Sequence, residues 1–107
     1  MFARVVECQS KVGRSQQVSS KLQDEVLPIL QKQTGFSDFL TLADKTNTER
    51  LLCISLWTSR EAAWEHHRQH YDTITQLLMH VLESPPTLEI FAVNASTAHR
   101  IVIGRAA

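Results

Sequence analysis

Four short stretches of the chain alternate between apolar and polar residues, which predicts four β-strands. The third of them is apolar on both faces, a pattern typical of a central strand that is covered on both sides. Polar, turn-forming residues separate it from the second stretch, and their small number is compatible with a hairpin. The predicted strands are residues 2–9, 36–43, 49–57 and 87–94.

Two longer stretches carry apolar residues at intervals of three and four, which is typical of amphipathic helices. The first covers residues 14–33, where Leu30 widens an apolar stripe. Pro28 lies inside this stretch and lacks a backbone N–H, so a kink or a broken last turn is expected there. Gly35 follows and favours a left-handed end to the helix. The stripe itself consists of Val18, Leu22, Val26 and Ile29.

The second helix is expected to begin at residues 58–61 and to end near Leu82. Its start, Thr-Ser-Arg-Glu, has the spacing of a capping box, with a hydroxyl residue three positions before a glutamate. A break is expected near Tyr71 and Asp72, and Pro85 and Pro86 follow the end of the helix. One continuous face is predicted to comprise Trp64, His67, Tyr71, Ile74, Leu78 and Val81.

The order of these elements is strand, helix, strand, strand, helix, strand. This order predicts an α+β fold of the ferredoxin-like βαββαβ type, a four-stranded antiparallel sheet with two helices on one face. The other sheet face is also apolar and needs a cover. A second copy is the simplest cover, so we expect a homodimer in which two sheets close on each other. One domain is expected over residues 1–95, followed by a tail at 96–107 whose apolar run, Ile101-Val102-Ile103, could add an edge strand or contact a partner.

Composition narrows the class of protein. The 107 residues are enough for one domain, and eleven basic side chains balance eleven acidic ones, so nucleic acid and anionic membranes are not expected partners. No membrane span and no signal peptide is evident, which favours a cytoplasmic protein. Cys8 and Cys53 lie in apolar strand patterns and lack Cys-x-x-Cys spacing, so we interpret them as buried thiols.

The residues whose side chains could bind a ligand or take part in a reaction cluster between positions 57 and 71. The second helix supplies most of them. Trp64, His67 and Tyr71 fall on one helix face, where the pocket between helices and sheet is expected. A neutral imidazole at His67 could take a proton from a phenol, and Tyr71 could donate a hydrogen bond to a developing oxyanion. Trp57 or Trp64 could form a flat wall for an aromatic ligand, although core packing is the alternative for both.

Three further side chains could serve either a structural or a binding role. His66 and His70 are four residues apart, a spacing that can grip a metal, but no third ligand is apparent and we favour a solvated helix face. No metal is therefore expected. Arg4 shares a strand face with apolar residues. If that face is buried, Arg4 needs a partner and could bind an anion or cross a dimer interface.

Four local features give the chain a resemblance to the antibiotic-biosynthesis-monooxygenase family of dimeric α+β barrels. They are Thr34-Gly35-Phe36, the Leu56-Trp57 strand end with the Thr58-Ser59-Arg60-Glu61-Ala62 that follows it, His66, and Pro85-Pro86 leading into Leu88-Glu89-Ile90-Phe91. The resemblance covers roughly residues 1–95. It implies the dimeric barrel, a pocket between sheet and helices in each protomer, and a small hydrophobic or aromatic ligand.

The family includes cofactor-independent monooxygenases that act on phenols or quinols and a branch that degrades haem. The haem branch has an asparagine in the first strand and a histidine about ten residues after a helix tryptophan. Here residues 2–9 contain no asparagine, and Ile74 stands ten residues after Trp64, so we expect neither haem nor another cofactor. The expected function is oxidation of a small aromatic or quinol-like compound. The alternative is a non-catalytic dimer that binds a small molecule or serves as a stress-related accessory.

Overall fold

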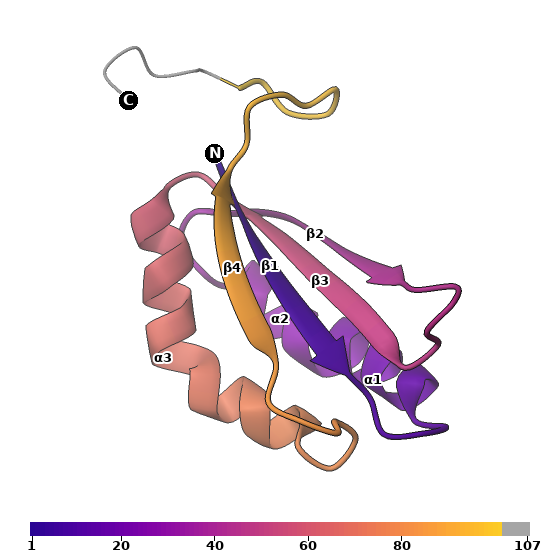
Figure 1. Cartoon of the computed structure of the whole chain (residues 1–107). Helices are drawn as coiled ribbons and strands as arrows, with labels where there is room; N and C mark the ends of the chain where they lie inside the picture. The colour runs from indigo at the N-terminus through magenta and orange to yellow at the C-terminus, as the bar shows by residue number, and fades with distance from the viewer. Residues whose placement is uncertain (102–107) are drawn as a thin grey trace.

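The computed structural model of the protein describes residues 1–101. Its strands form one antiparallel sheet in the order β2-β3-β1-β4, and the helices lie on one face of it (Figure 1). The element order confirms the predicted ferredoxin-like βαββαβ fold. The strands are β1 (Phe2–Gln9), β2 (Phe36–Ala43), β3 (Arg50–Trp57) and β4 (Thr87–Ala92).

The first helical segment is divided as the position of Pro28 predicted. It comprises α1 (Ser15–Lys21), a π-helical turn η1 (Leu22–Val26) and α2 (Leu27–Gln31). Pro28 lies in the first turn of α2 and cannot donate to the carbonyl of Asp24, so the regular α pattern is interrupted just before it. The extra residue of the π turn brings Leu30 into the core. Ile29, which the spacing placed on the same apolar stripe, is half-buried.

The second helix, α3 (Arg60–Leu78), is continuous through Tyr71, where a break was expected. It also ends before Leu82. After Leu78 the chain turns to pair with the end of β1, because the amide of Lys11 donates to the carbonyl of Val81 and that of Glu83 donates to the carbonyl of Gln9. Across residues 1–101, no helix is long and apolar enough to cross a membrane.

Burial alternates strictly along β3. Leu51, Cys53, Ser55 and Trp57 point to the helices and are buried, whereas the residues between them are only half-buried. β3 is central, as predicted, but a single chain covers only one of its faces. On the helix side, the buried apolar residues of β3 form the core together with Val18, Leu22, Val26 and Leu30 of the first helical segment and with residues of β1 and α3.

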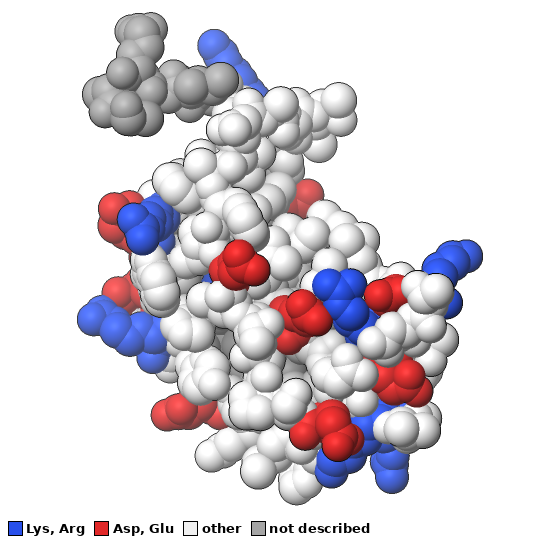
Figure 2. Space-filling model, viewed as in Figure 1, with Lys and Arg blue, Asp and Glu red and all other residues white. Residues whose placement is uncertain are grey.

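The open face of the sheet is largely apolar. Figure 2 views this face and shows mostly uncharged atoms in its upper part, with charged side chains in its middle, at its lower right and along its left margin. Strand register places eight apolar residues on it: Ala3, Val5, Leu40, Leu42, Leu52, Ile54, Leu56 and Phe91. Leu40, Leu42 and Phe91 are exposed. Such a surface is typical of an interface.

The described part of the tail returns to the sheet. The hydroxyl of Ser96 accepts hydrogen bonds from the amides of Ala98 and His99, and the His99 imidazole lies 3.2 Å from the Asp38 carboxylate of β2. The predicted apolar run at 101–103 falls outside the described residues except for Ile101.

Candidate functional site

The start of α3 is fixed by Ser59 and Gly35. Ser59 has extended backbone angles, and its hydroxyl accepts a hydrogen bond from the amide of Ala62 at 3.1 Å, so Ser59 and not Thr58 caps the helix. Thr58 instead donates its amide to the carbonyl of Gly35 at 2.8 Å. Gly35 has φ +85°, the left-handed conformation predicted for it. These contacts set where α3 begins and therefore which of its residues face the sheet.

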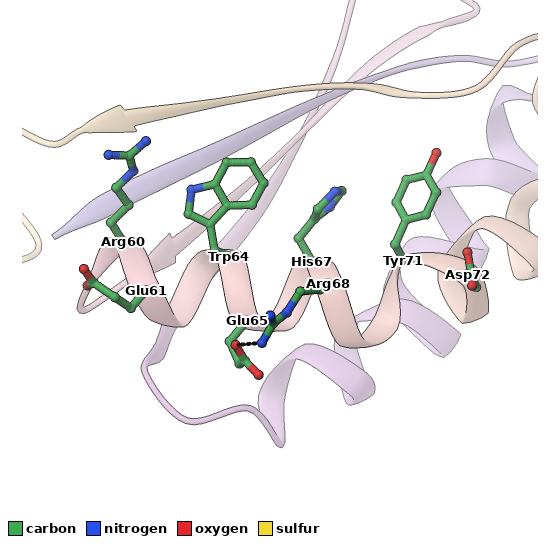
Figure 3. Close-up of a pocket in the computed structure, with 8 residues that line it drawn as sticks. All are labelled: Arg60, Glu61, Trp64, Glu65, His67, Arg68, Tyr71 and Asp72. Carbon is green, nitrogen blue, oxygen red and sulfur yellow. Dashed lines mark hydrogen bonds and ion pairs between the residues drawn. The ribbon is translucent and has the colours of Figure 1, made fainter.

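Trp64, His67 and Tyr71 form the row of rings that the helical spacing predicts. The ring centres of Trp64 and His67 are 5.7 Å apart, and those of His67 and Tyr71 are 5.0 Å apart, both in edge-to-face geometry. Figure 3 shows the three side chains pointing to the same side of α3. Trp64 and Tyr71 are 44% and 40% exposed, so the row borders an open groove and is not part of the core.

A cavity of about 70 Å³ lies between α3 and the sheet, beneath this row. His67 and Tyr71 line it from α3, and Arg4 and Val6 line it from β1. A second cavity of about 60 Å³ adjoins it further in, among the apolar residues of the core. Their shared walls are Arg4, Val6, Ile74, Leu78 and Pro86. The cavities therefore give His67 and Tyr71 access to an apolar interior.

His66 is buried, which contradicts the prediction of a solvated face for His66 and His70. Its side chain is 2% exposed and stacks between Trp57, with ring centres 5.1 Å apart, and His70, at 5.2 Å. His70 is half-buried and contacts the side-chain oxygen of Gln33 at 3.1 Å. The core-facing line of α3 runs through Ala63 and His66, one position away from the predicted row. Helical periodicity alone could not decide between two neighbouring lines that both contain rings.

Trp57 belongs to the core and lines neither cavity. It is completely buried, and its indole N–H donates to the hydroxyl of Ser55 at 2.8 Å. Phe36 packs edge-on against its ring. The core-packing alternative weighed for the two tryptophans thus describes Trp57, whereas Trp64 remains available to a ligand at the open groove.

Arg4 crosses the interior from β1 to α3. Its guanidinium lies 5.3 Å from the centre of the Trp57 ring and donates one hydrogen bond, to the carbonyl of Ala63 at 3.2 Å. The side chain is 6% exposed. Its Nε and the Nδ1 of His66 are buried polar atoms without a hydrogen-bond partner. Burial lowers the pKa of Arg4 to about 10, which still leaves it a cation at neutral pH.

The same surroundings keep the two histidines neutral. Burial, and then the charge of Arg4, lowers the pKa of His66 to about 3. Burial, again followed by Arg4, also lowers the pKa of His67. A neutral imidazole can accept a proton at physiological pH, so His67 has the protonation state that a general base requires.

Within residues 1–101, no group of three or more His, Cys, Asp or Glu side chains is arranged to hold a metal ion. Cys8 and Cys53 are free, buried thiols, as predicted, and both line the inner cavity.

A sequence profile of the family described as "Antibiotic biosynthesis monooxygenase" matches residues 1–73. The chain belongs to this family. No curated protein matches the chain significantly. The match confirms the resemblance inferred from the motifs at Gly35, Trp57 and His66.

Solved structures of similar proteins agree with the monooxygenase-family fold. SnoaB, a cofactor-independent oxygenase from Streptomyces nogalater, is 14% identical with a TM-score of 0.74 over 92% of this chain and 97% of its own. A Bordetella bronchiseptica protein named for the same family is 9% identical with a TM-score of 0.79, covering 88% and 97%. A conserved protein from Methanosarcina mazei is 24% identical with a TM-score of 0.69, covering 85% and 91%. At these identities the likeness concerns the fold.

In this family member, sequence reasoning missed the role of His66 in the interior. It recognised the signal for Arg4, a charged residue on the apolar face of β1, and the structure confirms that this face is buried. The signal for His66 was weaker, because the spacing on α3 fits two neighbouring lines and only the packing of the helix on the sheet separates them.

Proposed function

We propose that this monooxygenase-family protein oxidises a small aromatic or quinol-like compound with molecular oxygen and without a cofactor. The observation that carries the proposal is the pair His67 and Tyr71, which lie side by side on the wall of an apolar cavity. Convergent polar groups in an apolar cavity are typical of a site. SnoaB, which shares the fold, is described as a cofactor-independent oxygenase.

The reaction balances with the substrate as its own reductant. A phenol and one O₂ give a quinone and one water, so the substrate supplies all four electrons that reduce O₂. One oxygen atom enters the ring, and the other leaves as water with two hydrogens from the substrate. Removing the phenolic proton raises the electron density of the ring and favours attack on oxygen. The peroxide that forms then loses water as the O–O bond breaks. The protein needs to supply a base, a hydrogen-bond donor and a site from which bulk water is excluded.

In this proposal His67 takes the phenolic proton and Tyr71 donates a hydrogen bond to the oxygen that becomes negative. Trp64 continues the same row at the open end and forms a flat wall for the ring of the substrate. Trp57 does not contact the substrate in this proposal; it lies in the core, where it packs against His66 and Arg4.

Oxygen uptake with a panel of phenols and quinols tests the proposal. We expect turnover by the unaltered protein, a loss of roughly 100-fold in His67→Ala because a general base is removed, and a smaller loss in Tyr71→Phe. Since the pKa of His67 is lowered, activity should persist to below pH 6.5 and fall at lower pH as the imidazole is protonated. His80→Ala is the control, because His80 is exposed and outside the cavity.

Absence of oxygen uptake with every compound would contradict the enzyme proposal. The second candidate function is a non-catalytic dimer that binds a small molecule, which needs the same cavity but no turnover. Ligands that raise the melting temperature without being consumed would support that candidate.

We also propose that the protein is a homodimer in which the open faces of two sheets meet. The exposed apolar side chains of Leu40, Leu42 and Phe91 support this, because water would otherwise cover a broad apolar surface. Sedimentation at micromolar concentration should give twice the chain mass of 12.1 kDa. Leu42→Glu should shift the protein towards the monomer by placing a charge in the interface. A 12.1 kDa species from the unaltered chain would contradict the dimer.

A further inference from the structure

The cation of Arg4 has no counter-ion in the interior. Arg50 provides a contrast. It lies on the open face of the sheet, and its guanidinium contacts Glu7 at 2.9 Å and Asp44 at 3.3 Å. Arg4 is far more buried, yet no carboxylate lies within ion-pair distance of it in the described part of the chain, and the lining of both cavities contains no Asp or Glu. A buried charge without a partner is costly, and proteins rarely keep one without use.

The two groups that Arg4 contacts replace only part of its hydration. The carbonyl of Ala63 accepts a hydrogen bond from one of the five N–H groups of Arg4, and the ring face of Trp57 attracts the guanidinium more weakly. The Nε donor stays unpaired, and so does Nδ1 of His66 on the wall of the outer cavity. The interior therefore offers an anion both positive charge and free hydrogen-bonding capacity.

Arg4 also lies where a ligand in the cavity could contact it. It lines the outer cavity together with His67 and Tyr71, and it lines the inner cavity as well. An oxygen anion in the outer cavity would thus lie among the guanidinium, the imidazole and the phenol. The apolar side chains of Val6, Ile74 and Leu88 surround the remaining space and suit an aromatic or aliphatic body.

We propose that Arg4 binds the negatively charged oxygen of the ligand, so that the cavity selects aromatic oxyanions, carboxylates or phenolates, over their neutral counterparts. This inference rests on the proposed function for the identity of the site, since it names the ionisation state of the compound bound there. In the oxidation proposed above, Arg4 would hold the phenolate that His67 generates. Binding alone requires no oxygen and no turnover.

The test is binding of benzoate and of its neutral counterpart benzamide, measured by thermal shift and calorimetry. Benzoate should raise the melting temperature of the unaltered protein and benzamide should not. Arg4→Met should raise Kd for benzoate roughly tenfold or more, because the charged hydrogen bonds are lost. Arg14→Met, which removes an exposed arginine on the first helical segment, should leave Kd unchanged. Equal stabilisation by benzamide, or unchanged benzoate binding in Arg4→Met, overturns the inference.

Binding of a phenol tests the second class of ligand, the phenolates. The visible absorption of 4-nitrophenol reports its ionisation, and binding beside Arg4 should lower its apparent pKa in the unaltered protein but not in Arg4→Met. A benzoate response without this shift restricts the site to carboxylates and supports the inference for that class. If Arg4→Met does not fold, Arg4→Lys keeps the charge but loses the planar fork, and weaker benzoate binding is again expected. Unchanged binding in that variant overturns the inference.

The outcomes separate the two proposals. Arg4-dependent benzoate binding by a protein that never consumes oxygen supports the anion site and contradicts the monooxygenase proposal. Oxygen consumption accompanied by unchanged ligand binding in Arg4→Met contradicts the anion site alone.

Discussion

Gly35→Ala is expected to destabilise the protein by roughly 2–4 kcal/mol. Two effects contribute. An alanine is disfavoured at φ +85°, and its Cβ would lie 2.6 Å from the Cβ of Ala62 and 3.0 Å from the hydroxyl of Thr58. Because Ala62 lies in the first turn of α3, its Cβ cannot move without shifting the helix. Urea unfolding at neutral pH measures the change in the free energy of unfolding.

Gly13→Ala is the matched control. Gly13 has φ +76°, and a Cβ built there meets nothing within 4 Å. It should therefore show only the conformational part of the loss, about 1–2 kcal/mol. Ala62→Gly should restore part of the stability of Gly35→Ala, because it removes the closest contact, although glycine within a helix itself costs about 1 kcal/mol. Equal losses in the two alanine variants would contradict a steric role for Gly35.

Acidification is expected to destabilise the protein through His66. The unfolded chain protonates this imidazole below about pH 6.5, but the folded protein keeps it neutral down to a pKa of about 3. The unfolded state therefore binds more protons, and the free energy of unfolding falls as the pH falls through this window. Between pH 7 and 5 the loss from His66 should be roughly 2 kcal/mol. His67 has a shift of the same direction and adds to it.

His66→Phe removes this titration and keeps a ring between Trp57 and His70, so its stability should depend less steeply on pH. The same change at His80, which is exposed, is the control for the loss of an imidazole at the surface. Measurements between pH 7 and 5 avoid the acid limb where Asp44 and Asp38 titrate, because hydrogen bonds lower the pKa of both carboxyl groups. A His66→Phe variant with the slope of the unaltered protein would show that the imidazole is not kept neutral.

Most of the fold could be predicted from the sequence because strand alternation and helix spacing are local signals. β2 was predicted with its observed bounds, and the kink at Pro28 follows from a missing N–H. The end of α3 could not be predicted in this way. Val81 continues the helical spacing, but its carbonyl bonds to the amide of Lys11, a partner about seventy positions away in the chain.

The candidate site was predicted less completely. Spacing placed Trp64, His67 and Tyr71 in one row, and the structure confirms that the rings are neighbours. The line of α3 that faces the core, through Ala63 and His66, lies one residue away from this row. A difference of one residue rotates an α-helix by about 100° and exchanges buried for exposed positions. The spacing of apolar residues fits both lines, and His66 was therefore assigned to solvent.

The π turn at residues 22–26 has a consequence for chain length. Val18, Leu22, Val26 and Leu30 are spaced by four throughout, and in a regular α-helix such a row would rotate steadily away from the sheet, since each turn takes only 3.6 residues. The wider turn absorbs the excess and keeps all four residues buried. Related chains that are one residue shorter here could form an unbroken α-helix with the same core. A single insertion or deletion at this point is therefore compatible with one common packing arrangement.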